Sequence, residues 1–212
     1  MYSKKRLERD LCLDDFEAEA KNFLPRAIFG YMVGAAETNS SLIDNRAVFN
    51  ELAFVPRILK DVSNVSTNVT LWEDSFAAPF GIAPMGLSAI SAYRGDYVLA
   101  QAAQHNNIPM IMSGSSLIRL EEVAKIGKNV WFQAYLHGSE EQIIALVQRV
   151  ANAGYQKLVI TVDTPLAANR ENNIRAGFAT PLRPSLKLFM DGAMHPQWTL
   201  GTFLKTIYKY GM

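Results

Sequence analysis

Cysteine is almost absent from this sequence of 212 residues, and so is any excess of charge. The single cysteine, Cys12, excludes an intramolecular disulfide framework and is typical of a reducing compartment. It lies in a charged N-terminal segment, so we interpret it as incidental rather than catalytic. The 21 basic and 20 acidic side chains nearly cancel, which leaves no electrostatic footprint for nucleic acid.

Long hydrophobic runs are lacking as well. No apolar run approaches the roughly 20 residues that a membrane-spanning helix needs. The first ten residues carry mixed charge and lack the apolar region of a signal peptide. We therefore expect a cytoplasmic protein, and we predict no metal site.

Hydrophobic residues make up 49% of the chain, so a sizeable core is expected. The first part shows helix signals: Pro25 suits a helix start, Gly34 suits a helix end, and Asp14 or Asp15 can cap an earlier helix. Ser40 or Ser41 can begin a further helix. The expected elements are helices over 26–33 and 42–49 and extended segments over 54–59 and 65–71.

From Phe80 onward, short apolar runs alternate with amphipathic ones, which predicts a parallel α/β sheet with right-handed crossovers. The clearest helix begins after Ser139, which forms a capping box with Gln142 and precedes one apolar face (Ile143, Ile144, Val147, Val150 and Ala151). Gly154 ends it. The expected strands are 80–83, 110–112, 130–136 and 158–162, and the other helices are 96–105 and 120–126.

The last of these runs, Leu158 to Val162, is β-branched and apolar, which predicts a strand buried on both faces. Asp163 follows it directly, and Pro165 forbids continuation of the strand. A carboxylate at the end of a buried strand is costly without a partner or a task. The alternative is that Asp163 only caps the loop.

Polar groups follow each expected strand, and the carboxyl ends of parallel strands meet at one edge of the sheet. An amide, hydroxyls and close backbone at one edge suit a planar, polar heterocycle. Taken singly, Gln133 and Tyr135 could be ordinary barrel lining and Ser113 a turn former. In chain order these groups are Pro84-Met85-Gly86, Ser113, Gln133 with Tyr135, Thr161 with Asp163, and Arg170.

The chain resembles the FMN-dependent α-hydroxy-acid dehydrogenases and oxidases, a family that includes glycolate oxidase, mandelate dehydrogenase and L-lactate dehydrogenase. The resemblance runs from about Phe23 to Trp198, and its order and spacing are specific. The motifs that carry it are Leu24-Pro25, Phe29-Gly30-Tyr31-Met32-Val33-Gly34-Ala35-Ala36-Glu37, Asn45-Arg46, Pro56-Arg57-Ile58-Leu59, Gly81-Ile82-Ala83-Pro84-Met85-Gly86, Trp131-Phe132-Gln133-Ala134-Tyr135, Thr161-Val162-Asp163-Thr164-Pro165, Asn169-Arg170-Glu171, and Met190-Asp191-Gly192-Ala193-Met194-His195-Pro196-Gln197-Trp198.

The resemblance implies FMN as cofactor and oxidation of a small L-2-hydroxy acid, lactate-like or mandelate-like, to the 2-oxo acid. It implies that Tyr31 and Arg170 bind the substrate carboxylate and that Tyr135 lies near the substrate hydroxyl. It further implies that Asp163 pairs with the catalytic histidine. The flavin would be held by Pro84, Met85 and Gly86 along their backbone and by Ser113, Gln133 and Thr161 at its edge.

The fold implied is α/β, the N-terminal half of a (β/α)8 barrel preceded by a short helical segment. A complete barrel takes about 250 residues. We divide the chain into a helical segment with lead-in strands (1–78), the first four β/α units of the FMN-binding barrel (79–170) and an irregular tail (171–212) with a short helix expected near 186–190. In the family the missing half supplies the histidine base, and we interpret His105, His137 and His195 as surface or loop residues.

This chain alone is therefore expected to be inactive, and it could be completed by a C-terminal half. The alternatives are a non-catalytic half barrel that binds flavin weakly or acts as a scaffold, and another α/β-barrel enzyme with a phosphorylated ligand. Unpaired apolar sheet edges would favour association into homo-oligomers. The tail from Leu182 to Tyr210 mixes apolar and basic side chains, which indicates either peripheral contact with the inner face of the cytoplasmic membrane or packing against the rest of a barrel.

Overall fold

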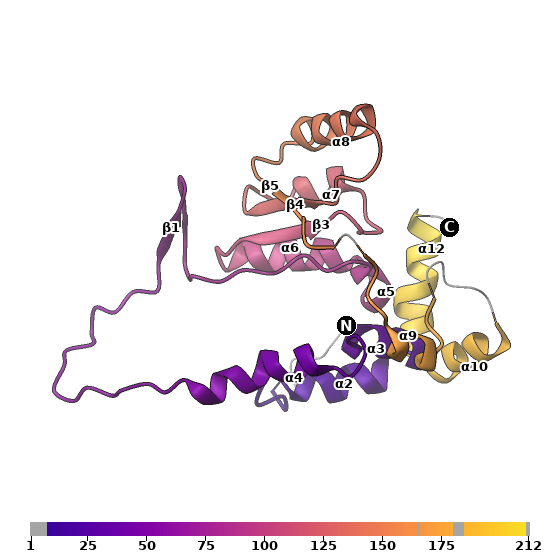
Figure 1. Cartoon of the computed structure of the whole chain (residues 1–212), viewed down its shortest axis with the longest axis horizontal. Coiled ribbons are helices and arrows are strands. Elements are labelled where there is room, and N and C mark those ends of the chain that lie inside the picture. The colour runs from indigo at the N-terminus through magenta and orange to yellow at the C-terminus, as the bar shows by residue number, and fades with distance from the viewer. Residues whose placement is uncertain (1–7, 165, 180–184, 211–212) are drawn as a thin grey trace. The chain divides into compact units, whose positions relative to one another are not determined.

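The computed structural model describes residues 8–164, 166–179 and 185–210 (Figure 1). It divides into two compact units, one formed by Phe54–Ala167 and the other by Met1–Ala53 together with Ala168–Met212. These boundaries lie elsewhere than those expected at residues 78 and 170. The N-terminal helices and the C-terminal tail, far apart in sequence, thus form one unit.

The unit Phe54–Ala167 is built around a three-stranded parallel sheet in the order β3, β4, β5 (Met110–Ser113, Val130–Ala134, Leu158–Ile160). Helices α6 (Gly95–His105), α7 (Leu120–Ala124) and α8 (Glu140–Asn152) alternate with the strands along the chain, as the sequence predicts. The strand expected over 80–83 is reduced to one parallel bridge between Ile82 and Met110. Phe80 is 66% exposed, so this end of the sheet lacks the burial that would extend the pairing.

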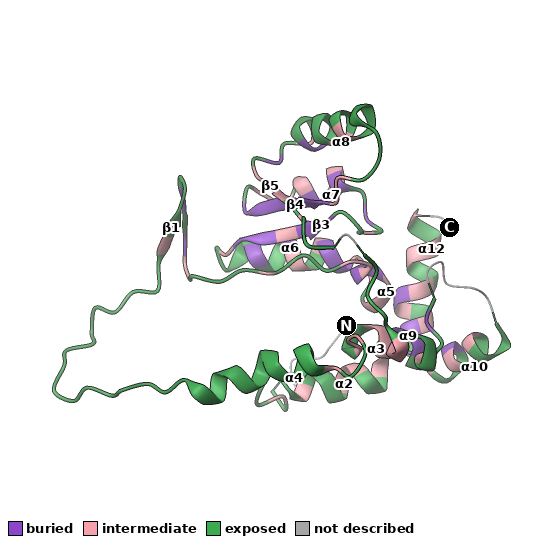
Figure 2. Cartoon of the chain, viewed as in Figure 1, coloured by how far each residue is buried: buried purple, intermediate pink, exposed green. Residues whose placement is uncertain are grey.

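The core of this unit lies between the sheet and its helices. All five residues of β4 are buried (Figure 2). The ring of Phe132 packs edge-on against Tyr155 with their centroids 5.5 Å apart. The Tyr155 hydroxyl donates a 2.9 Å hydrogen bond to the Leu120 carbonyl, and burial raises the pKa of that hydroxyl.

Strand β5 corrects the expectation of a strand buried on both faces. It ends at Ile160 rather than Val162, and its residues are only partly buried. Ile160 is 47% exposed and Val162 is 85% exposed. The physical reason is position, because β5 has a neighbour on one side only.

Helix α8 begins as the sequence predicts. The Ser139 hydroxyl accepts a hydrogen bond from the Gln142 amide, and the Gln142 side chain accepts one from the Ser139 N–H. Of its expected apolar face only Val150 is buried, whereas Ile144 is 58% exposed. The cap is local and forms regardless, but burial of the face requires a neighbour that covers it.

A hairpin that the sequence did not predict forms a separate two-stranded sheet in this unit and packs against the amino-terminal part of β4. Strands β1 (Val69–Leu71) and β2 (Asp74–Phe76) pair antiparallel. Trp72 and Phe76 place their rings against Trp131 of β4, with centroids 5.3 and 6.1 Å away. The extended segment expected over 65–71 thus contributes only β1, and the one expected over 54–59 is exposed and forms no strand.

The other unit is helical. Helix α2 (Asp15–Phe23) begins at one of the two expected capping residues, although Asp14 at its N-cap makes no side-chain capping bond. Helices α3 (Arg26–Val33) and α4 (Ser40–Ala47, followed by a 3-10 turn, Val48–Glu51) match the expected ones to within two residues. Pro25 directly precedes α3 and Gly34 follows it, as predicted. Helix α9 (Glu171–Ala176) packs on α3 so closely that a Cβ on Gly30 would lie 2.3 Å from the Cβ of Ala176.

The tail differs most from its description as irregular. It contains α10 (Leu186–Met194), α11 (Pro196–Trp198), a π-helical turn (Thr199–Phe203) and α12 (Leu204–Tyr210). Pro196 does not break this helical run because it stands at the first position of α11, where its missing N–H costs nothing. Trp198, one of the apolar tail residues that membrane contact would expose, is buried and stacks on Phe203 at 5.3 Å.

Candidate functional site

Three of the predicted flavin-edge residues form one hydrogen-bonded row at the carboxyl ends of the strands. Ser113 ends β3 and lies opposite Gln133 in the β3–β4 register. The Ser113 hydroxyl donates to Oε1 of Gln133 at 3.3 Å, and Nε2 of Gln133 donates to the Thr161 hydroxyl at 2.8 Å. The Thr161 N–H in turn donates to the Ala134 carbonyl at 3.1 Å. We call Ser113, Gln133 and Thr161 the polar row.

The polar row has one defined amide orientation. The Gly114 N–H donates to Oε1 of Gln133 at 3.1 Å, so the oxygen of this amide must face β3 and its nitrogen must face Thr161. Gln133 is 1% exposed and Ser113 is 2% exposed. A Cβ on Gly114 would lie 2.8 Å from the Gln133 carbonyl oxygen, so a side chain there would disturb the row. The row is therefore a preorganised arrangement of donors and acceptors.

The segment Pro84–Gly86 lies beside the polar row. It follows Ile82, whose carbonyl accepts a 2.9 Å hydrogen bond from the N–H of Ile111 in β3. Just after it, the Leu87 N–H donates to the Ser115 carbonyl at 3.2 Å. Pro84 and Met85 are exposed. Accessible backbone therefore stands next to the strand that carries Ser113, as the sequence predicts.

The two predicted catalytic residues of this unit lie near the same strand ends. Tyr135 directly follows β4, is half-buried and stacks on the His137 ring with centroids 5.9 Å apart. Asp163 follows β5 and is exposed. Water therefore solvates its carboxylate in this chain, and the expectation of a costly buried group does not hold here.

The two predicted carboxylate-binding residues lie in the helical unit. Tyr31 belongs to α3 and stacks on Phe178 with centroids 4.3 Å apart. Arg170 is exposed and directly precedes α9. Nδ2 of Asn172 in α9 donates to Oδ1 of Asn39 at 2.7 Å. This bond and the packing of α9 on α3 fix the elements that carry Tyr31 and Arg170.

The histidines differ from the expected pattern in one case. His105 ends α6 and is exposed, as is His137. His195 is half-buried between α10 and α11, and its ring Nδ1 lies 2.7 Å from the Asp191 carbonyl oxygen. His195 thus fixes a helix junction instead of lying on a loop surface.

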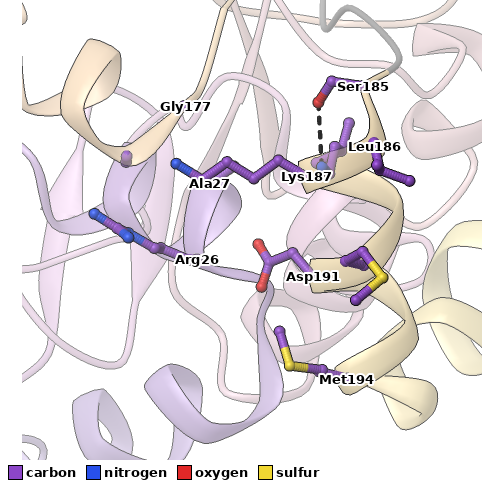
Figure 3. A pocket seen from close by; sticks show the side chains of 11 residues that line it. Arg26, Ala27, Gly177, Ser185, Leu186, Lys187, Asp191 and Met194 are labelled. Carbon is purple, nitrogen blue, oxygen red and sulfur yellow. Dashed lines mark hydrogen bonds between the residues drawn. The ribbon is translucent and has the colours of Figure 1, made fainter.

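A pocket of about 670 Å³ lies in the helical unit (Figure 3). Arg26 and Lys187 line it together with Asp191 and the apolar side chains of Leu186, Met190 and Met194. None of the predicted site residues lines this pocket. Because the chemistry predicted from the sequence lies at the strand ends, we place the candidate site there and not in the pocket.

Comparison with known proteins decides the family. A sequence model of the FMN-dependent dehydrogenases matches residues 20–210. The chain belongs to this family. It is 34% identical over 175 residues to L-lactate oxidase of Lysinibacillus sphaericus, a match that covers 82% of this chain and 45% of that protein. The chain spans about half the length of the curated relatives it matches.

Solved structures agree with this assignment. The chain superposes on a monotopic membrane protein, (S)-mandelate dehydrogenase, with a TM-score of 0.84 and 31% identity, covering 94% of this chain and 52% of the other. It also matches a mandelate oxidase variant that carries a C4a-OH-FMN adduct, with a TM-score of 0.74 and 32% identity, covering 78% of this chain and 50% of that one. FMN is thus the cofactor of the family, as the resemblance implied.

Proposed function

We propose that this chain is the FMN-binding, N-terminal half of a (β/α)8 barrel that oxidises a small L-2-hydroxy acid to the 2-oxo acid. The observation that carries the proposal is the polar row at the carboxyl ends of β3, β4 and β5. Ligand sites of parallel α/β folds lie at that end of the strands. The relatives named for L-lactate and mandelate support a lactate-like or mandelate-like substrate.

The residues present fit a flavin. The Gln133 amide carries two N–H bonds and Thr161 accepts only one of them, so a donor remains for a ring oxygen or nitrogen. Pro84 and Met85 are exposed and Gly86 is half-buried, so this segment is accessible to a flat ring system. When bound, FMN supplies the two-electron acceptor for the hydroxy acid.

The chain's own residues would bind and orient the substrate. The resemblance assigns the substrate carboxylate to Arg170 and Tyr31, which suit it because a guanidinium and a phenol hydroxyl both donate to carboxylate oxygens. Tyr135 would hydrogen-bond the substrate hydroxyl. Asp163 would pair with an imidazole supplied by the part of the barrel outside this chain, favouring its protonated form.

Flavin titration tests the proposal directly. We expect the full chain to quench FMN fluorescence on binding. We expect Gln133→Leu to weaken that binding by roughly tenfold or more, because it removes both the oxygen and the nitrogen of the side-chain amide. Gln101→Leu, at an exposed position of α6, is the matched control and should bind like the wild type. Equal binding by all three proteins would contradict the assignment of the polar row.

Turnover is a separate measurement. With FMN and an artificial electron acceptor, the chain alone should not oxidise L-lactate or L-mandelate, because no histidine of this sequence occupies the position of the base. The corresponding C-terminal half of a relative, added in trans, should restore some activity. Turnover by the chain alone would contradict the half-barrel proposal.

A non-catalytic half barrel is the second candidate. The observation that favours it is the exposure of Asp163 and of the edge strand β5, which leaves the proposed catalytic group in water. This candidate predicts flavin binding without turnover even when a C-terminal half is supplied and shown to associate.

We also propose peripheral contact with an anionic, cytoplasmic membrane surface through α10 and α12. Apolar side chains of these helices are exposed, including Leu186 at 79%, Phe189 at 73% and Tyr208 at 94%, and Lys187 and Lys209 accompany them. The likeness to a monotopic membrane enzyme supports this proposal.

In the part of the chain that the structure describes, every helix is too short or too polar to cross a bilayer. Leu182 and Arg183, counted in the tail, lie outside the described residues.

Vesicle co-sedimentation tests the membrane proposal. The full chain should bind anionic liposomes, and Leu186→Ser with Phe189→Ser should weaken binding, as should added salt. Ile144→Ser, at a position on α8 that is 58% exposed, is the matched control. A folded sample that ignores anionic liposomes would rule the proposal out and leave packing against the rest of a barrel as the role of the tail.

A further inference from the structure

A buried carboxylate that the proposed function does not use lies behind the flavin-binding loops. Asp96, in the first turn of α6, is 1% exposed. Its Oδ2 accepts a hydrogen bond from the Ser88 hydroxyl and another from the Ser116 hydroxyl, each at 2.6 Å. Its Oδ1 is buried and has no hydrogen-bond partner among the described residues. Both hydrogen bonds are short for hydroxyl donors, so Asp96 holds both serines firmly.

The two serines end the two segments that carry predicted flavin contacts: Ser88 is the first residue of helix α5 (Ser88–Ser91), and Ser116 lies in the loop after β3. Ser88 lies two residues after Gly86, and Ser116 lies three residues after Ser113. The Leu87 N–H also joins the loops directly, through its bond to the Ser115 carbonyl at 3.2 Å. The loops are thus fixed to each other at one point and to Asp96 at two.

The backbone around this contact is close-packed, and two of its residues have left-handed conformations. A Cβ on Gly95 would lie 2.6 Å from the Ser88 carbonyl oxygen, so the first loop rests directly on the beginning of α6. Leu87 has φ of 57° and Arg94 has φ of 58°, in the region that residues other than glycine rarely adopt. Such conformations persist only where the surrounding contacts determine them.

We infer that Asp96 is a positioning residue for FMN, which holds the Pro84–Ser88 and Ser113–Ser116 loops in the mutual arrangement that the flavin requires. The inference rests on the proposed function, in which these loops contact the cofactor. Asp96 itself stands behind the loops, bonded to Ser88 and Ser116 rather than to the polar row. A binding site keeps its geometry only where a second set of residues fixes the residues that touch the ligand.

A purely structural role makes a different prediction. An acidic residue in the first turn stabilises a helix through the helix dipole. In that case loss of the carboxylate would lower the stability of the unit and leave the FMN affinity of the folded protein unchanged. Affinity and stability must therefore be measured on the same variants.

The experiment compares Asp96→Ala with Asp96→Asn in the full chain. We expect Asp96→Ala to weaken FMN binding by about tenfold or more in fluorescence titration, because both serines lose their acceptor. Asp96→Asn should stay within about threefold of the wild type, because its amide oxygen can accept from both hydroxyls. Ser116→Ala should fall between them, and Gln101→Ala, at an exposed position of α6, should change nothing.

Hydrogen exchange at the Leu87 amide gives a readout that does not depend on FMN. We expect this amide to exchange faster in Asp96→Ala and Ser116→Ala while the amides of β4 keep their protection. Folded Asp96→Ala with wild-type affinity and unchanged Leu87 exchange would overturn the inference. If the wild type binds no FMN, the proposed function fails by itself, and Leu87 exchange still decides whether Asp96 positions the loops. If Asp96→Ala does not fold, Ser116→Ala and Asp96→Asn carry the same test.

Discussion

Strands β4 and β5 are neighbours in one parallel sheet and have very different surroundings. Val130–Ala134 and Leu158–Ile160 are both short apolar runs between a helix and a polar loop. Every residue of β4 is buried, whereas β5 is partly exposed throughout. Strand β4 pairs with β3 on one side and β5 on the other, while β5 pairs only with β4.

The difference shows that a short, largely apolar run predicts a strand but not its burial. The side chains of β5 are suited to a covered position, and the relatives, about twice as long as this chain, have further sequence with which to cover it. The polar row forms nonetheless, because each of its bonds needs only the adjacent strand. The polar row, which is the part of the candidate site that lies at the sheet, is thus preorganised. Asp163, beyond the edge strand, is not.

The contrast in burial predicts that truncating a side chain of β4 lowers the free energy of unfolding far more than truncating one directly after β5. Phe132→Ala removes a ring that is 4% exposed and packed on Tyr155, so we expect a loss of about 3–5 kcal/mol in the free energy of unfolding. Val162→Ala, at an 85% exposed position, should change it by less than about 0.5 kcal/mol. Urea unfolding followed by circular dichroism measures both. Equal losses would mean that the chain directly after β5 is covered in solution.

The β1–β2 hairpin is held by an ion pair whose contribution to stability depends on pH. The Lys157 ammonium donates a hydrogen bond to Asp74 and, with a smaller contribution from Lys128, holds the pKa of that carboxyl below its usual value. The stabilisation is therefore complete above the pKa of the unfolded chain, about 4, and disappears as the pH falls through the lower folded value. Asp74→Asn should lower stability at neutral pH and flatten its decline in acid.

The control for this prediction is an exposed ion pair. Arg149 lowers the pKa of Glu121 in a similar way, but both side chains are largely solvated, so Glu121→Gln should have a smaller effect. Urea midpoints between about pH 3 and about pH 7 make the comparison. An acid limb that stays as steep in Asp74→Asn as in the wild type would show that this ion pair does not hold the hairpin.

The smallest expected change in stability accompanies a change in association. An open apolar sheet edge favours self-association, and a lysine at the edge opposes it. Val162→Lys should leave the unfolding free energy within about 0.5 kcal/mol of the wild type and reduce oligomers in sedimentation velocity. Val98→Lys, on the exposed face of α6, should leave association unchanged. A wild-type chain that is already monomeric would show that the edge is protected in another way.

Much of the local structure could be predicted from the sequence. The capping box at Ser139, the helix between Pro25 and Gly34 and the alternation of strands and helices each depend on residues close together in the chain. The neighbours in the polar row could be predicted as well, because parallel strands align their carboxyl ends. The start of α10 matches the helix expected near 186–190. The hairpin pairing of β1 with β2 and the later helices of the tail were missed, since short strands and proline-containing helices give weak periodic signals.

The family, the α/β alternation and the residues at the strand ends thus follow from the order of residues along the chain. Only the tertiary structure decided which strand is buried, that Asp163 lies in water and that Trp198 is covered. It also revealed Asp96, because in the sequence an acid at the start of a helix is an ordinary stabilising residue. The physical reason is range: caps and periodicity depend on neighbours along the chain, whereas burial and the bonds of Asp96 to Ser88 and Ser116 depend on segments that only folding brings together.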